Sequence, residues 1–236
     1  MIDELIKYFI STAVITTGIV YIGKKIFDKS ADFTLKKFEM ELNKKYQKDE
    51  RKLEELKKWT NPLLSSLNGL IGRLNNIVNE DGYKHLSNSS SEYEYYMPST
   101  LYYLSQYLCY IQILREEINY EIFDDNKNES NFFQVLKKVN KSLRGKDNNF
   151  DRPLYSLEQR EISELMMDIN YNNKRVCKSY YSFHEKFETP EMREILKPLR
   201  NLFENIQKND KKFNRLSLLL TALRELKKES ENLLKK

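Results

Sequence analysis

The chain has 236 residues, 32% of them charged, and its 40 basic and 35 acidic side chains leave a formal net charge of +5. This small excess argues against a nucleic-acid-binding class, which usually concentrates positive charge on one face, and we predict no specific nucleic-acid partner. The 6 glycines and 5 prolines are fewer than tight turns and β-hairpins usually require. The composition therefore favours an all-α fold.

The first predicted element is the uncharged run YFISTAVITTGIVYIG, which lies between Lys7 and Lys24. As a helix, its 16 residues span about 24 Å, and flanking lysine stems can extend that length towards the roughly 30 Å of a bilayer core. Its apolar residues occupy every face, whereas a soluble amphipathic helix has one polar side. We predict an N-terminal transmembrane helix, with a buried core helix as the alternative.

Lysines and tyrosines at the two ends of this run predict its position and orientation in a bilayer. Tyrosine rings favour the membrane interface and lysine side chains reach the headgroups, so the expected anchors are Lys7, Tyr8, Tyr21, Lys24 and Lys25. More lysines follow the run than precede it, and positive residues remain on the cytoplasmic side. We therefore predict a single-pass protein of the inner (plasma) membrane whose C-terminal domain is cytoplasmic.

Small residues within the run suggest contact between copies of this helix. Thr12 and Thr16 form a small-xxx-small pair, and Ser11 and Gly18 are seven residues apart. Small side chains let transmembrane helices approach closely, so these four residues predict a self-association face and a homo-oligomer. The alternative is that they are merely tolerated in a single span.

Residues 30–61 predict a long charged helix, or stalk. An apolar stripe near 3.5-residue spacing is interrupted around Asp49, which disfavours a long autonomous coiled coil; the stripe consists of Phe33, Leu35, Phe38, Leu42, Tyr46, Leu53 and Leu56. Thr60 or Asn61 is expected to cap the next helix, with Pro62 in its first turn. The predicted domains are therefore an anchor (1–29), a stalk (30–61) and a helical bundle (62–236).

Within the bundle, apolar residues at helical spacing predict a series of helices. The predicted helices cover residues 63–80, 99–123 (capped by Ser/Thr after Pro98), 131–144, a stretch from Ser156 through Phe187, a restart at Thr189, and the C-terminal segment from Phe213. A polar loop is expected over 81–98. Ser156 and Gln159 predict a capping box, and Pro198 is expected to kink or interrupt its helix.

Four stretches resemble a family of uncharacterised bacterial proteins in their order. They are Trp59 to Pro62, RLNNIV (Arg73 to Val78), LYYLSQYLCYIQILREEI (Leu101 to Ile118) and SLEQREISELM (Ser156 to Met166). The resemblance implies a single-span anchor, a charged stalk and a helical cytoplasmic domain, and it implies no activity. In that family a second basic residue often follows the position of Arg115, where this chain has Glu116.

No motif for catalysis, metal binding or nucleotide binding is present, so we predict a non-enzyme without a cofactor. Neither His85 nor His184 completes the arginine–histidine motif of the helical HEPN ribonucleases. Cys109 and Cys177 form no CxxC pair and fit a reducing compartment. The best polar candidates are Arg115, Glu116, Gln159, Arg160 and Glu161, which lie in or beside apolar helical stretches.

These five residues allow two interpretations. If their helices face each other, Arg115 could pair with Glu161, or Arg160 with Glu116, to form structural ion pairs. Alternatively, the arginines could bind a small anion inside the bundle. The leading hypothesis is a membrane-anchored protein that acts by self-association or by binding a protein partner, as an effector or accessory in bacterial defence. The second is a membrane-tethered sensor of a small anionic ligand.

Overall fold

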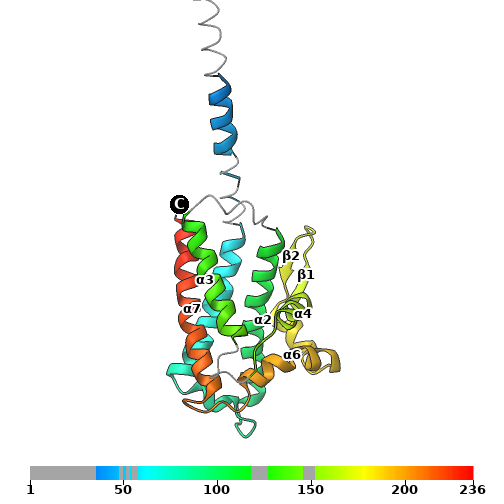
Figure 1. Ribbon diagram of the computed structural model, residues 1–236. Helices are drawn as coiled ribbons and strands as arrows, with labels where there is room; N and C mark the ends of the chain where they lie inside the picture. The colour runs from blue at the N-terminus through cyan, green and yellow to red at the C-terminus, as the bar shows by residue number, and fades with distance from the viewer. Residues whose placement is uncertain are drawn as a thin grey trace, which may run out of the picture. The chain divides into compact units, whose positions relative to one another are not determined.

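The computed structural model describes residues 36–47, 50–51, 54, 58–117, 127–145 and 152–235. The chain divides into two compact units, residues 1–53 and residues 54–236, and each is described by itself. The described residues are mostly helical (Figure 1), which confirms the predicted all-α class. Within the described ranges, no helix combines the length and the hydropathy required to cross a bilayer.

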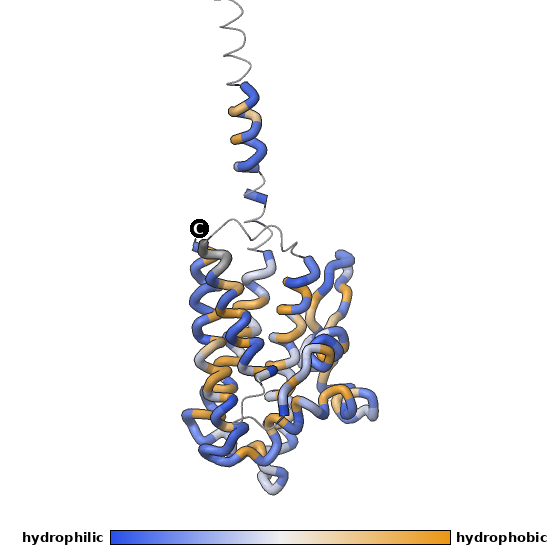
Figure 2. The backbone as a smooth tube through the Cα atoms, in the orientation of Figure 1, coloured by the Kyte–Doolittle hydropathy of each residue, from blue (hydrophilic) through white to orange (hydrophobic). Residues whose placement is uncertain are grey.

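The described part of the first unit is mainly a helix over residues 36–47, all of whose residues are exposed. Three large apolar side chains on it are 61%, 37% and 69% exposed, namely Phe38, Leu42 and Tyr46. Because residues four apart lie on one face of an α-helix, they form a continuous row, which we call the stalk row. Figure 2 shows hydrophobic positions on this otherwise hydrophilic helix.

The second unit is built around long helices that run along a common direction (Figure 1): residues 58–79, α2 (Tyr93–Glu117), α3 (Lys127–Arg144) and α7 (Lys211–Leu234). α3 packs against α7. Arg73 Nη2 donates to Ser99 Oγ at 2.9 Å and joins helix 58–79 to α2, while Arg224 Nη2 donates to Asn75 Oδ1 at 2.7 Å and joins α7 to the same helix. Buried leucine, isoleucine and aromatic side chains from all these helices form one hydrophobic core.

Shorter elements cover the rest of the core. They are η1 (Gly82–Leu86), α4 (Ser156–Met166), β1 (Met167–Ile169), β2 (Arg175–Cys177), α5 (Tyr180–Lys186) and α6 (Pro190–Phe203). α4 and β2 both pack against α2. The predicted polar loop over 81–98 was therefore too long, because η1 places Leu86 in the core and α2 already begins at Tyr93.

The prediction of helical structure from Ser156 through Phe187 is wrong in its middle. α4 ends at Met166, and β1 and β2 form an antiparallel hairpin in which Met167 is opposite Cys177. At the turn, the Asn170 side chain accepts hydrogen bonds from the backbone amides of Asn172 and Lys174, both at 3.0 Å. This Asx-type turn offers the backbone an alternative to the helix, and apolar residues on both sides happened to keep helical spacing.

Prolines marked a helix end at one of the expected places: α6 begins at Pro190 with Thr189 as its N-cap, which confirms the predicted restart. At the other expected places, prolines lie inside helices. Residues 58–79 are continuous helix, so Thr60 and Asn61 lie inside it and do not cap it at Pro62. Pro98 lies within α2, and Pro198 lies within α6 without interrupting it. One proline removes a single amide donor from a helix, and burial of the neighbouring apolar residues sustains these helices in spite of that loss.

Candidate functional site

The five polar residues predicted from the sequence lie on two helices that pack against each other, as expected for α2 and α4. Arg115 is half-buried near the end of α2, and the neighbouring Glu116 is exposed. On α4, Gln159 is buried, whereas Arg160 and Glu161 are exposed. Since only Gln159 is shielded from solvent, these residues do not line an enclosed pocket.

Glu116 pairs with an arginine that the sequence did not suggest. Arg175 on β2 donates to Glu116 Oε2, and Gln112 Nε2 donates to Glu116 Oε1 at 2.7 Å. Arg160 Nε instead donates to Glu164 Oε1 at 2.8 Å, one turn along α4. The hydrogen bond and charge of Glu164, followed by the charge of Glu116, raise the pKa of Arg160. The predicted pairing of Arg160 with Glu116 is therefore replaced by two separate pairs, Arg160–Glu164 and Arg175–Glu116.

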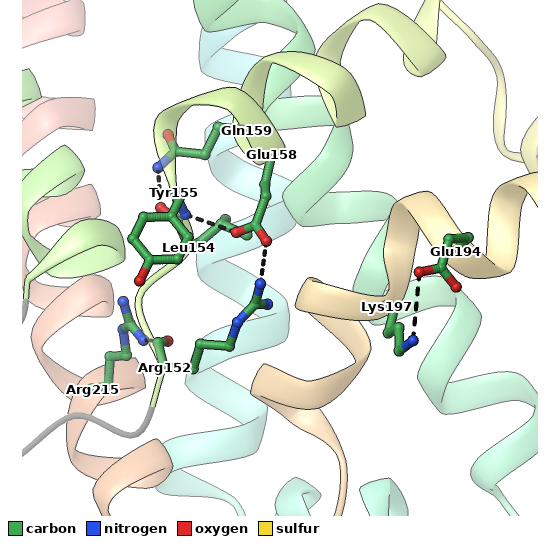
Figure 3. Close-up of polar contacts among 8 residues, drawn as sticks. All are labelled: Arg152, Leu154, Tyr155, Glu158, Gln159, Glu194, Lys197 and Arg215. Atoms are coloured by element: carbon green, nitrogen blue, oxygen red, sulfur yellow. Dashed lines mark hydrogen bonds and ion pairs between the residues drawn. The ribbon is translucent and has the colours of Figure 1, made fainter.

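Gln159 has a structural role at the start of α4, where the observed capping box is shifted by one residue from the predicted one. Its Nε2 donates to the carbonyl of Leu154 at 2.9 Å, whereas the carboxylate of Glu158 accepts from the backbone amide of Tyr155 at 2.9 Å (Figure 3). Arg152 donates to the other oxygen of Glu158. The box therefore uses Glu158 in place of Gln159, and both side chains stabilise the turn that enters α4.

The β-hairpin is attached to α2 through a group of polar contacts that we call the hairpin junction, comprising Tyr102, Glu116, Arg175 and Lys178. Tyr102 on α2 donates its hydroxyl to the carbonyl of Lys178 at 3.1 Å. Lys178 Nζ donates to the carbonyl of Leu165 in α4 at 2.6 Å. Together with the Arg175–Glu116 pair, these bonds connect the hairpin to both helices.

Tyrosines of α2 are not suited to proton transfer near neutral pH. Burial raises the pKa of Tyr102, Tyr107 and Tyr110 above the usual tyrosine value. The hydroxyl of Tyr107 is buried and has no hydrogen-bond partner among the described residues. These side chains stay protonated in the folded protein and therefore serve as hydrogen-bond donors or as packing groups.

A second arginine site, which sequence analysis missed, is centred on Arg215 of α7. Its side chain is 2% exposed. Nε donates to the carbonyl of Ser142 at 2.9 Å, and the two Nη atoms donate to the carbonyls of Leu143 and Arg152. We call this arrangement the Arg215 cap, because the last carbonyls of a helix lack intrahelical amide partners and two of those of α3 accept here from a guanidinium.

A pocket of about 310 Å³ adjoins the Arg215 cap; its lining residues are Arg152, Pro198, Asn201, Leu202, Glu204, Asn205, Lys212 and Arg215. Three of these side chains are basic and one is acidic. The carboxylate of Glu204 accepts a hydrogen bond from the Tyr93 hydroxyl at 3.1 Å, and its carbonyl accepts one from Lys212 Nζ at 2.9 Å. The lining is therefore net positive, which suits a small anion.

The signal for Arg215 was present in the sequence. Arg215 lies four residues before Leu219 and eight before Leu223, so it shares the buried stripe of α7. Arg115 and Arg160 were instead predicted as the polar site residues, because of their apolar neighbours along the chain. Arg215 is buried because it lies on the apolar stripe of its helix, whereas apolar neighbours along the chain do not bury Arg160.

Across the described part of the chain, no group of three or more His, Cys, Asp or Glu side chains could hold a metal ion. The imidazoles of His85 and His184 lie beside tyrosine rings, with centroids 5.0 Å from Tyr96 and 5.5 Å from Tyr180. Both histidines are thus aromatic packing partners in this arrangement.

The predicted membrane residues are outside the described ranges. They are the anchors Lys7, Tyr8, Tyr21, Lys24 and Lys25 and the self-association residues Ser11, Thr12, Thr16 and Gly18. No protein-family model, curated protein or solved structure matches this chain. Proposals about the function of this protein therefore depend on its own residues, and the family resemblance stays a prediction.

Proposed function

We propose that this protein is a membrane-anchored, non-enzymatic helical protein that acts by self-association. The observation that carries the proposal is the stalk row. Phe38, Leu42 and Tyr46 are large apolar residues exposed on one face of a helix, and burying such a row against another chain is the usual way to remove it from water. The uncharged run that precedes the stalk supplies the membrane anchor.

The expected occupant of the stalk row is the same helix of a second copy. An anchor at one end of the stalk holds copies parallel in one membrane and raises their effective concentration. With 3.6 residues per turn, Glu39 and Lys45 lie on opposite sides of the row. In a parallel pair of helices these two sides face each other across the interface, so charged residues flank the apolar row as they do at the e and g positions of a coiled coil.

The test is the mass of the full-length protein extracted in mild detergent, measured by light scattering after size-exclusion chromatography. We expect an oligomer that Phe38→Glu and Leu42→Glu together reduce to a monomer. Met40→Glu is the matched control, because Met40 is also exposed and apolar but lies about half a turn away, and it should leave the mass unchanged. A monomeric wild-type protein would contradict self-association, and a chain that stays soluble without detergent would contradict the anchor.

The basic pocket favours a second function, a membrane-tethered sensor that binds a small anionic ligand. Lining by Arg152, Lys212 and Arg215 supports this alternative, and it relocates the proposed ligand contacts away from Arg115 and Arg160. Inorganic phosphate and pyrophosphate should raise the midpoint of thermal unfolding, and Lys212→Ala should abolish this shift. Lys211→Ala serves as the control, since Lys211 is exposed and does not line the pocket. Equal shifts in both variants would contradict a site at the pocket.

A further inference from the structure

The fold brings together two cysteines that are far apart in the sequence. Cys109 lies on α2 and is fully buried, whereas Cys177 is the last residue of β2 and is partly exposed. β2 packs against α2, and Cys109 lies midway between Tyr102 and Glu116 on one face of α2, the two residues that contact the chain on either side of Cys177. The thiol of Cys109 is accordingly the main influence on the pKa of the Cys177 thiol. Both thiols are free, so the pair is a dithiol with one side open to solvent.

Polar contacts hold the hairpin where the two thiols meet. Tyr102 of α2 donates to the carbonyl of Lys178, the residue directly after Cys177, at 3.1 Å. On the other side of Cys177, Arg175 pairs with Glu116 of α2. The backbone amide of Lys178 also donates to the carbonyl of Met166 at 2.8 Å. Cys177 is therefore positioned against α2 from both sides.

We propose that Cys109 and Cys177 are an oxidation site at which a low-molecular-weight disulfide, such as oxidised glutathione, forms an intramolecular disulfide that joins the hairpin to α2. In the first step the Cys177 thiolate attacks the small disulfide, a mixed disulfide forms, and one small thiolate leaves. The Cys109 sulfur then attacks the Cys177 sulfur and displaces the second small thiolate. The two protons of the cysteines end on the two released thiols, so two thiols are oxidised and one disulfide is reduced.

The surroundings of Cys177 determine how readily this reaction starts. The hydrogen bond with Cys109 and then burial raise the pKa of the Cys177 thiol, while the nearby Lys178 ammonium opposes that rise. Because only the thiolate attacks a disulfide, the reduced pair is stable at neutral pH and reacts under sustained oxidant or at higher pH. The consequence for the fold is local, since a two-stranded hairpin is marginally stable alone and the bond fixes its base.

The experiment treats the full-length protein in detergent with oxidised glutathione at pH 8.5 and follows intact mass, peptide mapping and thermal unfolding. We expect a wild-type product that has lost two hydrogens, carries no glutathione and links the Cys109 and Cys177 peptides. Its unfolding midpoint should rise by roughly 4–10 °C and return after reduction. Cys109→Ser should stop at the mixed disulfide on Cys177, because the second thiol is missing.

Cys177→Ser is the matched control, because it leaves only the buried Cys109 thiol, which should not react in the folded protein. A wild-type product that keeps one glutathione would show that the thiols cannot meet and would overturn the proposal. A disulfide-linked dimer would overturn it as well, and so would a folded wild-type protein that never reacts although its denatured form does. Serine keeps the size of cysteine, and the unfolding midpoint of each variant verifies that it is folded before treatment.

Discussion

The Arg215 cap and the hairpin junction use the same guanidinium group in opposite environments. Arg215 is buried and donates to main-chain carbonyls at the end of α3. Arg175 is largely exposed and donates to the carboxylate of Glu116 on α2. The contact with a full opposite charge is the one that water can readily replace, whereas the contacts with neutral carbonyls belong to a side chain that is almost completely shielded from water.

This difference reverses the expectation that ion pairs are the stronger contacts. Exposed ion pairs contribute little, because water screens the charges and the side chains lose entropy. Removing the Arg215 guanidinium breaks three charge-assisted hydrogen bonds to main-chain carbonyls, although the Leu143 carbonyl keeps the backbone amide of Leu154 as a donor. Stability should therefore depend on Arg215 much more than on the arginines that the sequence singled out.

The largest effect is expected for Arg215→Met, which keeps much of the side-chain volume and removes the donors. It should lower the free energy of unfolding by about 3 kcal/mol, because three hydrogen bonds from a charged donor are lost. Urea denaturation of the variant and the wild-type protein measures the loss. Arg160→Met is the control and should cost far less, since Arg160 is exposed with one partner, Glu164. Equal losses of stability in the two variants would contradict the claim that the buried arginine contributes more than the exposed one.

A pH effect should follow from burial around the centre of α2. The raised pKa of Tyr107 means that the folded state keeps the phenol proton after the unfolded chain has lost it. Its contribution is complete below about pH 10 and is lost as pH rises towards the folded-state pKa. Above pH 10 the free energy of unfolding should fall by up to about 1.4 kcal/mol per pH unit for this residue. Alkaline urea titrations of the wild-type protein and Tyr107→Phe should differ by that slope, and equal slopes would contradict the assignment.

Two tyrosines of α2 are expected to show a smaller difference in stability, because the hydroxyl of one makes a hydrogen bond and the buried hydroxyl of the other makes none among the described residues. Tyr102→Phe removes the bond to the Lys178 carbonyl at the hairpin junction and should cost about 1 kcal/mol. Tyr107→Phe removes a buried hydroxyl that has no partner among the described residues and should be neutral or stabilise by up to about 1 kcal/mol. Thermal or urea unfolding near neutral pH measures both. A loss of stability in Tyr107→Phe equal to that in Tyr102→Phe would contradict the assigned difference.

Helices with periodic apolar residues were predictable from the sequence, whereas an element that depends on local side-chain contacts was not. The long helices α2, α3 and α7 were predictable, because each places apolar residues at a constant spacing on the core side. The hairpin was not, because three-residue strands are too short for a strand period to stand out. Its turn depends on the Asn170 side chain, whose effect on the backbone is local.

The two helices that carry the polar cluster were predicted correctly, but the ion-pair partners of its residues were not. α2 and α4 do pack together, yet Glu116 binds Arg175, a residue assigned to the middle of a predicted helix. The Cys109–Cys177 contact was missed for the same reason, since it also requires the hairpin to fold back on α2. The burial of Arg215 was predictable from its place on the apolar stripe of α7, but its contacts were not, because its partners are carbonyls, which carry no sequence signal.

The smallest expected effect is the coupling between Arg175 and Glu116 at the hairpin junction. A double-mutant cycle with Arg175→Gln and Glu116→Gln should give roughly 0.2–1 kcal/mol, because both side chains are partly exposed. The coupling should shrink further at high salt, since mobile ions screen exposed charges. Urea unfolding of the four proteins at low and high salt measures it. A salt-insensitive coupling above about 2 kcal/mol would mean that the pair behaves like a buried one. Access to water would then not be what separates Arg175 from Arg215.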